Sequence, residues 1–223
     1  MQWRSRVRLV DEVAQELRER IYAGTYEAGM PLRQEQLAEE LQVSRTPLRE
    51  ALRVLEREGL LKSEPGRGAR VVSADIKKLL DAYQLREVID GLAARLAARS
   101  EDVEARQALA KMVADQHAAL EPWHAAGYVL SNVEFHVAVI ELADNEYLAG
   151  QIPLVRMTSQ VFMPVGPVEK ERATLAVSEH QLVAEAIAAG EAEEAERLAR
   201  AHITTTIKRL SEGAMPPKKG HAQ

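Results

Sequence analysis

From residue 76 to residue 211 the apolar residues of this chain recur with helical periodicity and without the alternation typical of strands. Helices that each carry one apolar face must bury those faces against one another. The expected helices lie at about 76–99, 102–120, 124–143, 146–163, 173–189 and 191–211. Pro153 should kink the fourth of them or mark its true start. The sequence therefore predicts an all-helical antiparallel bundle over residues 74–212, with a disordered tail at 213–223.

The first 73 residues have a different pattern. Helical periodicity predicts three helices, at about 9–23, 34–41 and 45–58, and Ser44 is a typical N-cap for the third. Two short strands flank the turn Pro65-Gly66-Arg67-Gly68 and should form a hairpin, the only sheet in the protein. This order of elements predicts a winged helix-turn-helix at 1–73, in a protein that is otherwise mainly α.

The formal net charge of −5 does not exclude a nucleic-acid partner, because the charge is unevenly distributed. Residues 1–75 contain 13 basic and 13 acidic side chains, and residues 45–70 contain seven basic and four acidic ones. A local basic patch determines phosphate contact, whereas the total charge does not. The expected third helix and hairpin are therefore suited to contact DNA.

Composition also limits the class of protein. The chain has no cysteine, which excludes disulfide frameworks, thiolate metal sites and cysteine nucleophiles. No apolar run approaches the roughly 20 residues that span a bilayer, and the charged N-terminal segment is unlike a signal peptide. We therefore expect a cytoplasmic protein with no membrane partner.

The candidate DNA-reading residues lie at the start of the third helix. Arg45 and Arg49 are one turn apart, opposite the apolar stripe, with Thr46 beside them. Arginines in such a position can enter the major groove and bind guanine edges, while the helix N-terminus favours phosphate. Taken alone, these arginines are better explained as a solvated surface. Their place in the order of helices and hairpin favours DNA binding.

Four segments in this region resemble the N-terminal domain of the GntR superfamily of regulators. They are residues 21–26 (IYAGTY), 37–41 (LAEEL), 43–52 (VSRTPLREAL) and 55–61 (LEREGLL). Two small departures are Ala28 and Gln34, where the family usually has Pro and Glu. The resemblance implies that Arg45, Thr46 and Arg49, together with the capping Ser44, read or clamp an operator. It also implies that Gly66, Arg67 and Gly68 form the tip of the wing.

Three histidines fall on the apolar faces of three different expected helices. They are His136, His180 and His202, and Asn132 lies one turn before His136 on the same face. A lone inward histidine is more often a hydrogen-bonded core residue. Three of them with an amide partner favour a divalent metal ion such as Zn, Ni or Mn, because imidazole nitrogens and one oxygen are suitable ligands.

Arg86 also lies on an apolar stripe, together with Tyr83. A buried guanidinium requires an anion, and a carboxylate can accept from it through two oxygens. The anion could be a ligand or an internal acidic residue such as Asp90 or Glu134. The sequence leaves both explanations open.

Residues 76–211 resemble the FCD effector domain of the FadR branch of that superfamily. The matching segments are 85–89 (LREVI), 132–136 (NVEFH), 143–145 (ADN), Glu179-His180 and His202. The resemblance implies a metal held by Asn132, His136, His180 and His202, and a small carboxylate effector near Arg86, Tyr83 and Asn132. Asn132 stands where Asp is frequent, and its neutral oxygen binds a divalent ion less strongly.

These features together predict a ligand-responsive transcription regulator, most simply a repressor, that binds an operator in double-stranded DNA as a homodimer. A metal-dependent hydrolase or lyase using the three histidines is the alternative from another class. It would leave the DNA-binding pattern unexplained. A non-specific architectural DNA protein conflicts with the acidic helical region.

Overall fold

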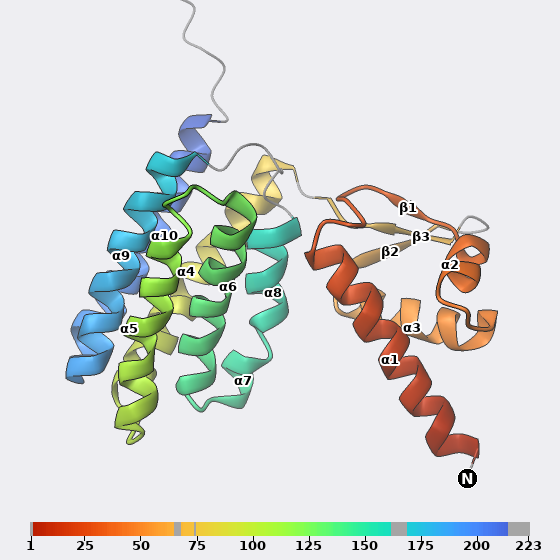
Figure 1. Ribbon diagram of the computed structural model, residues 1–223, viewed down its shortest axis with the longest axis horizontal. Helices are drawn as coiled ribbons and strands as arrows, with labels where there is room; N and C mark the ends of the chain where they lie inside the picture. Colours follow the sequence, from red (N-terminus) through yellow and green to blue (C-terminus); the bar gives the residue numbers. More distant parts are fainter. Residues whose placement is uncertain (1, 65–67, 74, 162–168, 214–223) are drawn as a thin grey trace, which may run out of the picture. The chain divides into compact units, whose positions relative to one another are not determined.

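The computed structural model describes residues 2–64, 68–73, 75–161 and 169–213 (Figure 1). The chain divides into two compact units between residues 74 and 75. Of the sequence predictions, the wing-tip residues Gly66 and Arg67 and the tail at 214–223 lie outside the described residues.

Among its described residues the N-terminal unit contains three helices: α1 (Gln2–Tyr22), α2 (Gln34–Glu40) and α3 (Arg45–Arg57). The apolar stripes that predicted α1 and α3 are buried, and these two helices pack against each other. The buried stripe residues are Val13, Leu17, Ile21, Leu48, Leu52 and Leu55. Helix α1 begins earlier than the predicted residue 9. Ser44 occupies the N-cap position of α3, but its side chain makes no capping hydrogen bond.

The predicted hairpin is present, but among the described residues the sheet of the N-terminal unit also has a third strand that the sequence did not predict. Strands β2 (Leu61–Glu64) and β3 (Gly68–Val71) form the expected antiparallel hairpin. Strand β1 (Pro31–Leu32) pairs antiparallel with β3 on its other side. Proline lacks a backbone N–H and is tolerated on an edge strand. A two-residue strand that includes Pro31 has no alternation by which the sequence could reveal it.

The C-terminal unit is entirely helical among its described residues, as predicted. It is built from α4 (Ile76–Ala98), α5 (Val103–Ala118), α6 (Ala125–Leu142), α7 (Glu146–Ala149), α8 (Ile152–Arg156), the π-helix η1 (Met157–Val161), α9 (Lys170–Ala189) and α10 (Ala192–Gly213). The long helices lie with their axes roughly aligned (Figure 1). None of the described helices combines the length and apolarity that crossing a bilayer requires.

Small residues on α4 let α10 pack closely against it. Ala93, Ala94 and Ala97 are buried in the core. A Cβ at Gly91 would lie 2.6 Å from the Cγ of Arg200 on α10. The close packing of α4 against α10 therefore determines which side chains of these two helices face the core of the bundle.

The single helix predicted at 146–163 was wrong. The chain forms α7, then α8, then η1, and Pro153 lies in the first turn of α8, as the alternative interpretation had it. A proline in the first turn costs no hydrogen bond, because that N–H has no partner within the helix. Helix α9 begins at Lys170 rather than at residue 173.

Gly68 gives a test of the sheet. Its φ is +106°, and an added Cβ would lie 2.3 Å from the carbonyl oxygen of Leu32 in β1. We expect Gly68→Ala to lower the free energy of unfolding by about 3 kcal/mol, because it combines backbone strain with a clash against a strand. Gly24→Ala is the matched control, since Gly24 has φ +77° and no atom within 4 Å of the added Cβ. It should cost only about 1 kcal/mol in urea denaturation. Equal costs would contradict the three-stranded arrangement.

Candidate DNA-binding face and candidate metal centre

The first turns of α3 expose the residues predicted to read DNA. Arg45, Thr46 and Arg49 are exposed, as is Ser44, while Leu48 on the opposite face is buried. The buried stripe fixes the rotation of α3 about its axis, and this rotation points the arginines outward. The helix-turn-helix geometry that the sequence predicted is therefore present.

A groove of about 970 Å³ runs between this helix, α2 and the sheet. Among the residues that the structure describes, its lining includes five arginines and two glutamates: Arg33, Arg45, Arg49, Arg53, Arg70, Glu35 and Glu64. Sequence reasoning missed Arg33 and Arg70. Arg70 is brought to the groove by the pairing of β3 with β1, which has no local sequence signal.

Ion pairs already hold two of these arginines. Arg45 donates to Glu35 at 2.8 Å, and Arg70 donates to Glu64 at 2.6 Å and to the carbonyl oxygen of Gly29 at 2.7 Å. Within the described part of the chain, Arg33, Arg49 and Arg53 have no carboxylate at ion-pairing distance. Arg49 and Arg53 are therefore the groove arginines of α3 that can bind an incoming phosphate or base without breaking an ion pair among the described residues, and Arg49 lies nearer the start of the helix.

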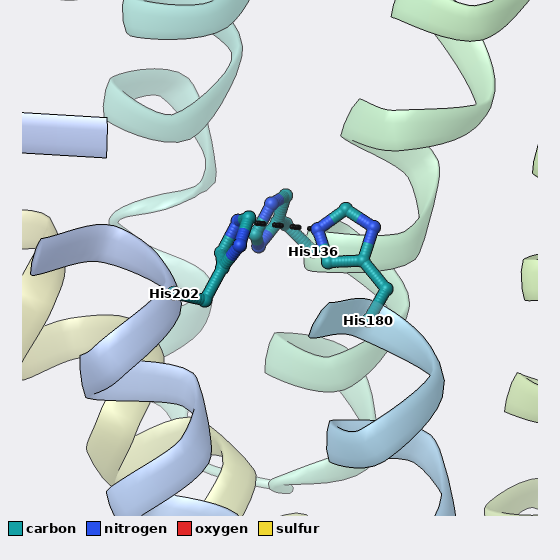
Figure 2. Close-up of side chains that lie close together, drawn as sticks. All are labelled: His136, His180 and His202. Carbon is teal, nitrogen blue, oxygen red and sulfur yellow. Dashed lines mark hydrogen bonds between the residues drawn. The ribbon is translucent and has the colours of Figure 1, made fainter. Parts of the chain in front are cut away.

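The three predicted histidines meet in the core of the C-terminal unit. His136 on α6, His180 on α9 and His202 on α10 are all buried, and ligand atoms of the three lie within 4.8 Å of one another. Figure 2 shows the three rings converging from their separate helices. The prediction that these side chains come together is confirmed by the structure.

Hydrogen bonds behind two of the rings determine which nitrogen carries the proton. Gln116 donates its amide N–H to the carbonyl oxygen of Ser131, so its Oε1 faces His180 and must accept from His180 Nδ1 at 2.7 Å. The carboxylate of Glu179 can only accept, and it lies 2.7 Å from His202 Nδ1. Both Nδ1 atoms are therefore donors, and in neutral rings both Nε2 atoms carry a lone pair.

The two Nε2 atoms of His180 and His202 face each other at 3.2 Å. In neutral rings with protonated Nδ1 atoms no proton lies between them, so two lone pairs point at one location. Two imidazole nitrogens bound tetrahedrally to one zinc ion are separated by about 3.3 Å. The adjoining cavity, lined by the three histidines and Asp90, measures about 20 Å³. That volume fits a single ion or water molecule, so these residues fit a divalent metal ion.

Burial and neighbouring charge favour the neutral form of two of the rings, His136 and His180. Burial, followed by the charge of Arg86, holds the pKa of His136 well below its ordinary value of 6.5. Burial, followed by His202 and Arg86, does the same to the pKa of His180. Neutral imidazole is the form that binds a metal ion.

Asn132, predicted as the oxygen ligand, lies on α6 beside this cluster but does not line the cavity. Its Oδ1 accepts from the hydroxyl of Tyr128 at 3.4 Å. The oxygen-bearing side chain that does line the cavity is Asp90 on α4. The role of Asn132 with metal or effector stays a prediction, and sequence reasoning considered Asp90 only as a partner of Arg86.

Arg86 is buried, as its position on the apolar stripe predicted. The anion that pairs with it in this structure is a side chain of the protein, the carboxylate of Asp90. Arg86 donates to Asp90 at 2.7 Å and to Ser159 Oγ at 3.1 Å, and its guanidinium lies 5.3 Å from the centre of the buried Tyr83 ring. Glu134, the other acidic candidate, pairs with Arg156 instead. The predicted effector role of Arg86 and Tyr83 stays a prediction.

Comparisons with known proteins give the family of this chain. Residues 9–71 match the family described as bacterial regulatory proteins, gntR family, and residues 81–205 match the FCD domain. The chain is a GntR-family regulator with an FCD domain. Family and relatives are transcription regulators and not enzymes, so the hydrolase alternative is not supported.

Two relatives and one solved structure illustrate the similarity. An Escherichia coli (strain K12) protein named as an L-lactate dehydrogenase operon regulatory protein is 31% identical, over 92% of this chain and 88% of its own length. A Paenarthrobacter nicotinovorans protein named as a D-xylose utilization operon transcriptional repressor is 28% identical, over 84% and 82%. The structure of E. coli McbR/YncC superposes with a TM-score of 0.80 at 20% identity, over 93% and 99%, and shows the same fold.

Arg49 gives a test of the DNA-binding face of this regulator. We expect Arg49→Ala to weaken binding to a DNA site selected by the wild-type protein by about 5- to 150-fold, which corresponds to one lost bidentate contact. Arg57→Ala is the matched control, because Arg57 is exposed in the last turn of α3 and does not line the groove. Fluorescence anisotropy at fixed salt measures both. Equal losses would show that the groove is not the reading surface.

Proposed function

We propose that this regulator binds its operator as a homodimer and represses transcription until a small carboxylate effector binds. We further propose that a divalent metal ion in the helical unit takes part in binding the effector. The observation that carries this proposal is the pair of inward-facing Nε2 atoms of His180 and His202. The operator is in the cytoplasm, which is the proposed location of the protein.

His136, His180 and His202 are the proposed metal ligands. When bound, the ion would act as a Lewis acid that attracts an anionic oxygen. The side chains contribute orientation, because the hydrogen bonds from Nδ1 to Gln116 and Glu179 hold two of the rings with Nε2 pointing inward. The helical scaffold excludes bulk water from the site, since all three rings are buried.

A carboxylate is favoured as effector by the buried guanidinium of Arg86. The relative named for the L-lactate dehydrogenase operon agrees with a hydroxy acid, whereas the relative named for D-xylose utilization points to a sugar. A sugar has no charge to pair with Arg86. The cavity of about 20 Å³ is too small for either compound, so the side chains that line it, Asp90 among them, would move when an effector binds. A carboxylate that reaches Arg86 would compete with Asp90 for the guanidinium.

A homodimer is favoured because one winged helix reads only half of an operator. Helix α4 carries an exposed apolar stripe of Leu85, Val88 and Leu92, with 51%, 48% and 38% of each residue exposed. Leu85 and Leu92 lie on either side of Val88 at nearly equal spacing. A two-fold axis near Val88 would therefore place Leu85 of one copy against Leu92 of the other, which is a self-complementary contact.

Repression with release by effector agrees with the relative named as a repressor. The test is operator binding by the metal-loaded regulator with L-lactate or D-xylose added, and again after treatment with EDTA. We expect L-lactate to weaken operator binding only in the metal-loaded protein, and D-xylose to have no effect. A response to D-xylose, or the same response to L-lactate after EDTA, would contradict the proposal.

The dimer surface is tested by placing a charge in the stripe. We expect Val88→Glu to convert a dimer to a monomer in sedimentation at micromolar concentration, because two carboxylates would face each other across the axis. Leu130→Glu on α6 and Leu175→Glu on α9 are matched controls, since both leucines are exposed but lie on other helices. Dissociation by a control and not by Val88→Glu would exclude α4 as the interface.

A further inference from the structure

Asp90 lies between Arg86 and His136. Its Oδ2 accepts from Arg86 at 2.7 Å and lies 3.5 Å from His136 Nδ1. Its Oδ1 is buried and has no hydrogen-bond partner among the described residues. One carboxylate oxygen thus faces both the guanidinium of Arg86 and the imidazole of His136, and all three side chains are buried.

Asp90 resembles two other side chains around the cluster in that it faces an Nδ1 atom, but unlike them it also lines the cavity. Gln116 accepts from the Nδ1 of His180, and Glu179 accepts from the Nδ1 of His202, each at 2.7 Å. Asp90 is the acceptor that faces the Nδ1 of His136, at a longer distance because Arg86 holds the same oxygen. All three rings therefore have a side-chain oxygen near Nδ1, and the oxygen near His136 is the one that Arg86 also holds.

We propose that Asp90 is the positioning residue of His136, and that its sharing with Arg86 couples metal binding to anion binding. This inference rests on the proposed metal site. When Arg86 holds Asp90, the third imidazole lacks a close acceptor. When the guanidinium is occupied by another carboxylate, Asp90 moves onto the Nδ1–H of His136. A carboxylate behind a ligating imidazole fixes the ring and raises its basicity, which strengthens metal binding.

Thermodynamic linkage gives the reverse effect. If an anion on Arg86 raises the affinity for the metal, the metal raises the affinity for the anion by the same factor. The linkage passes through one side chain, so it can be broken without removing a metal ligand. Asp90 would therefore act through His136 and would not itself need to bind the metal.

The test compares the zinc affinity of two variants. If Arg86 and Asp90 only stabilised the fold, both variants would change zinc affinity in the same direction. Arg86→Met releases Asp90 from the guanidinium and should tighten zinc binding. Arg86→Met/Asp90→Leu removes both members of the buried pair, so that no unpaired charge remains in the core. This double variant should weaken zinc binding about 10- to 100-fold. Zinc affinity is measured by competition with a chelator, and folding by circular dichroism. Asp81→Asn, an exposed carboxylate on the same helix, is the control and should leave zinc affinity unchanged.

The two variants moving zinc affinity in opposite directions would support the inference. Equal weakening, or no change in either, would overturn it while leaving the metal site intact. Absence of zinc binding by the wild-type protein would overturn the proposed metal site and this inference with it. His180→Ala distinguishes these cases, because it should abolish zinc binding whichever role Asp90 has.

Discussion

The helical unit depends on how the polar groups of its core satisfy one another. A buried imidazole must have partners for both nitrogens, since an unsatisfied polar atom in the core costs about 1–3 kcal/mol. Gln116 and Glu179 satisfy Nδ1 of His180 and His202, and this leaves the two Nε2 atoms facing each other at 3.2 Å. A cation between them resolves the repulsion of two lone pairs. The hydrogen bonds behind the rings thus favour the metal site as much as the rings do.

The DNA-binding unit follows a simpler constraint. The apolar stripe of α3 is buried against α1, and this contact determines which side chains the first turn of α3 exposes. Arg45 and Arg49 face outward for that reason. The sheet adds Arg70 to the same groove, because β1 and β3 pair beside it. Basic and acidic residues are equal in number over residues 1–75, but arginines outnumber glutamates in the groove.

Much of this arrangement could be predicted from the sequence, because helical periodicity assigns each side chain to a face. The exposure of Arg49 and the inward direction of His136, His180 and His202 follow from spacing alone. Gln116 had a usable signal that was missed, since it shares the apolar stripe of α5 with Leu109 and Val113. The pairing of β1 with β3 had none, because two residues including a proline show no period. Asp90 was recognised only as a partner for Arg86, since contacts among α4, α6 and α10 depend on how the helices pack.

The acceptors Gln116 and Glu179 place the proton of His180 and of His202 on Nδ1 before any metal binds. Two-dimensional ¹⁵N–¹H NMR of imidazole nitrogens, recorded on metal-free protein at neutral pH, distinguishes the two tautomers directly. We predict protonated Nδ1 and unprotonated Nε2 in both rings, and a shift of both Nε2 resonances when zinc is added. A proton on Nε2 of either ring in the metal-free protein, unchanged by zinc, would contradict this prediction.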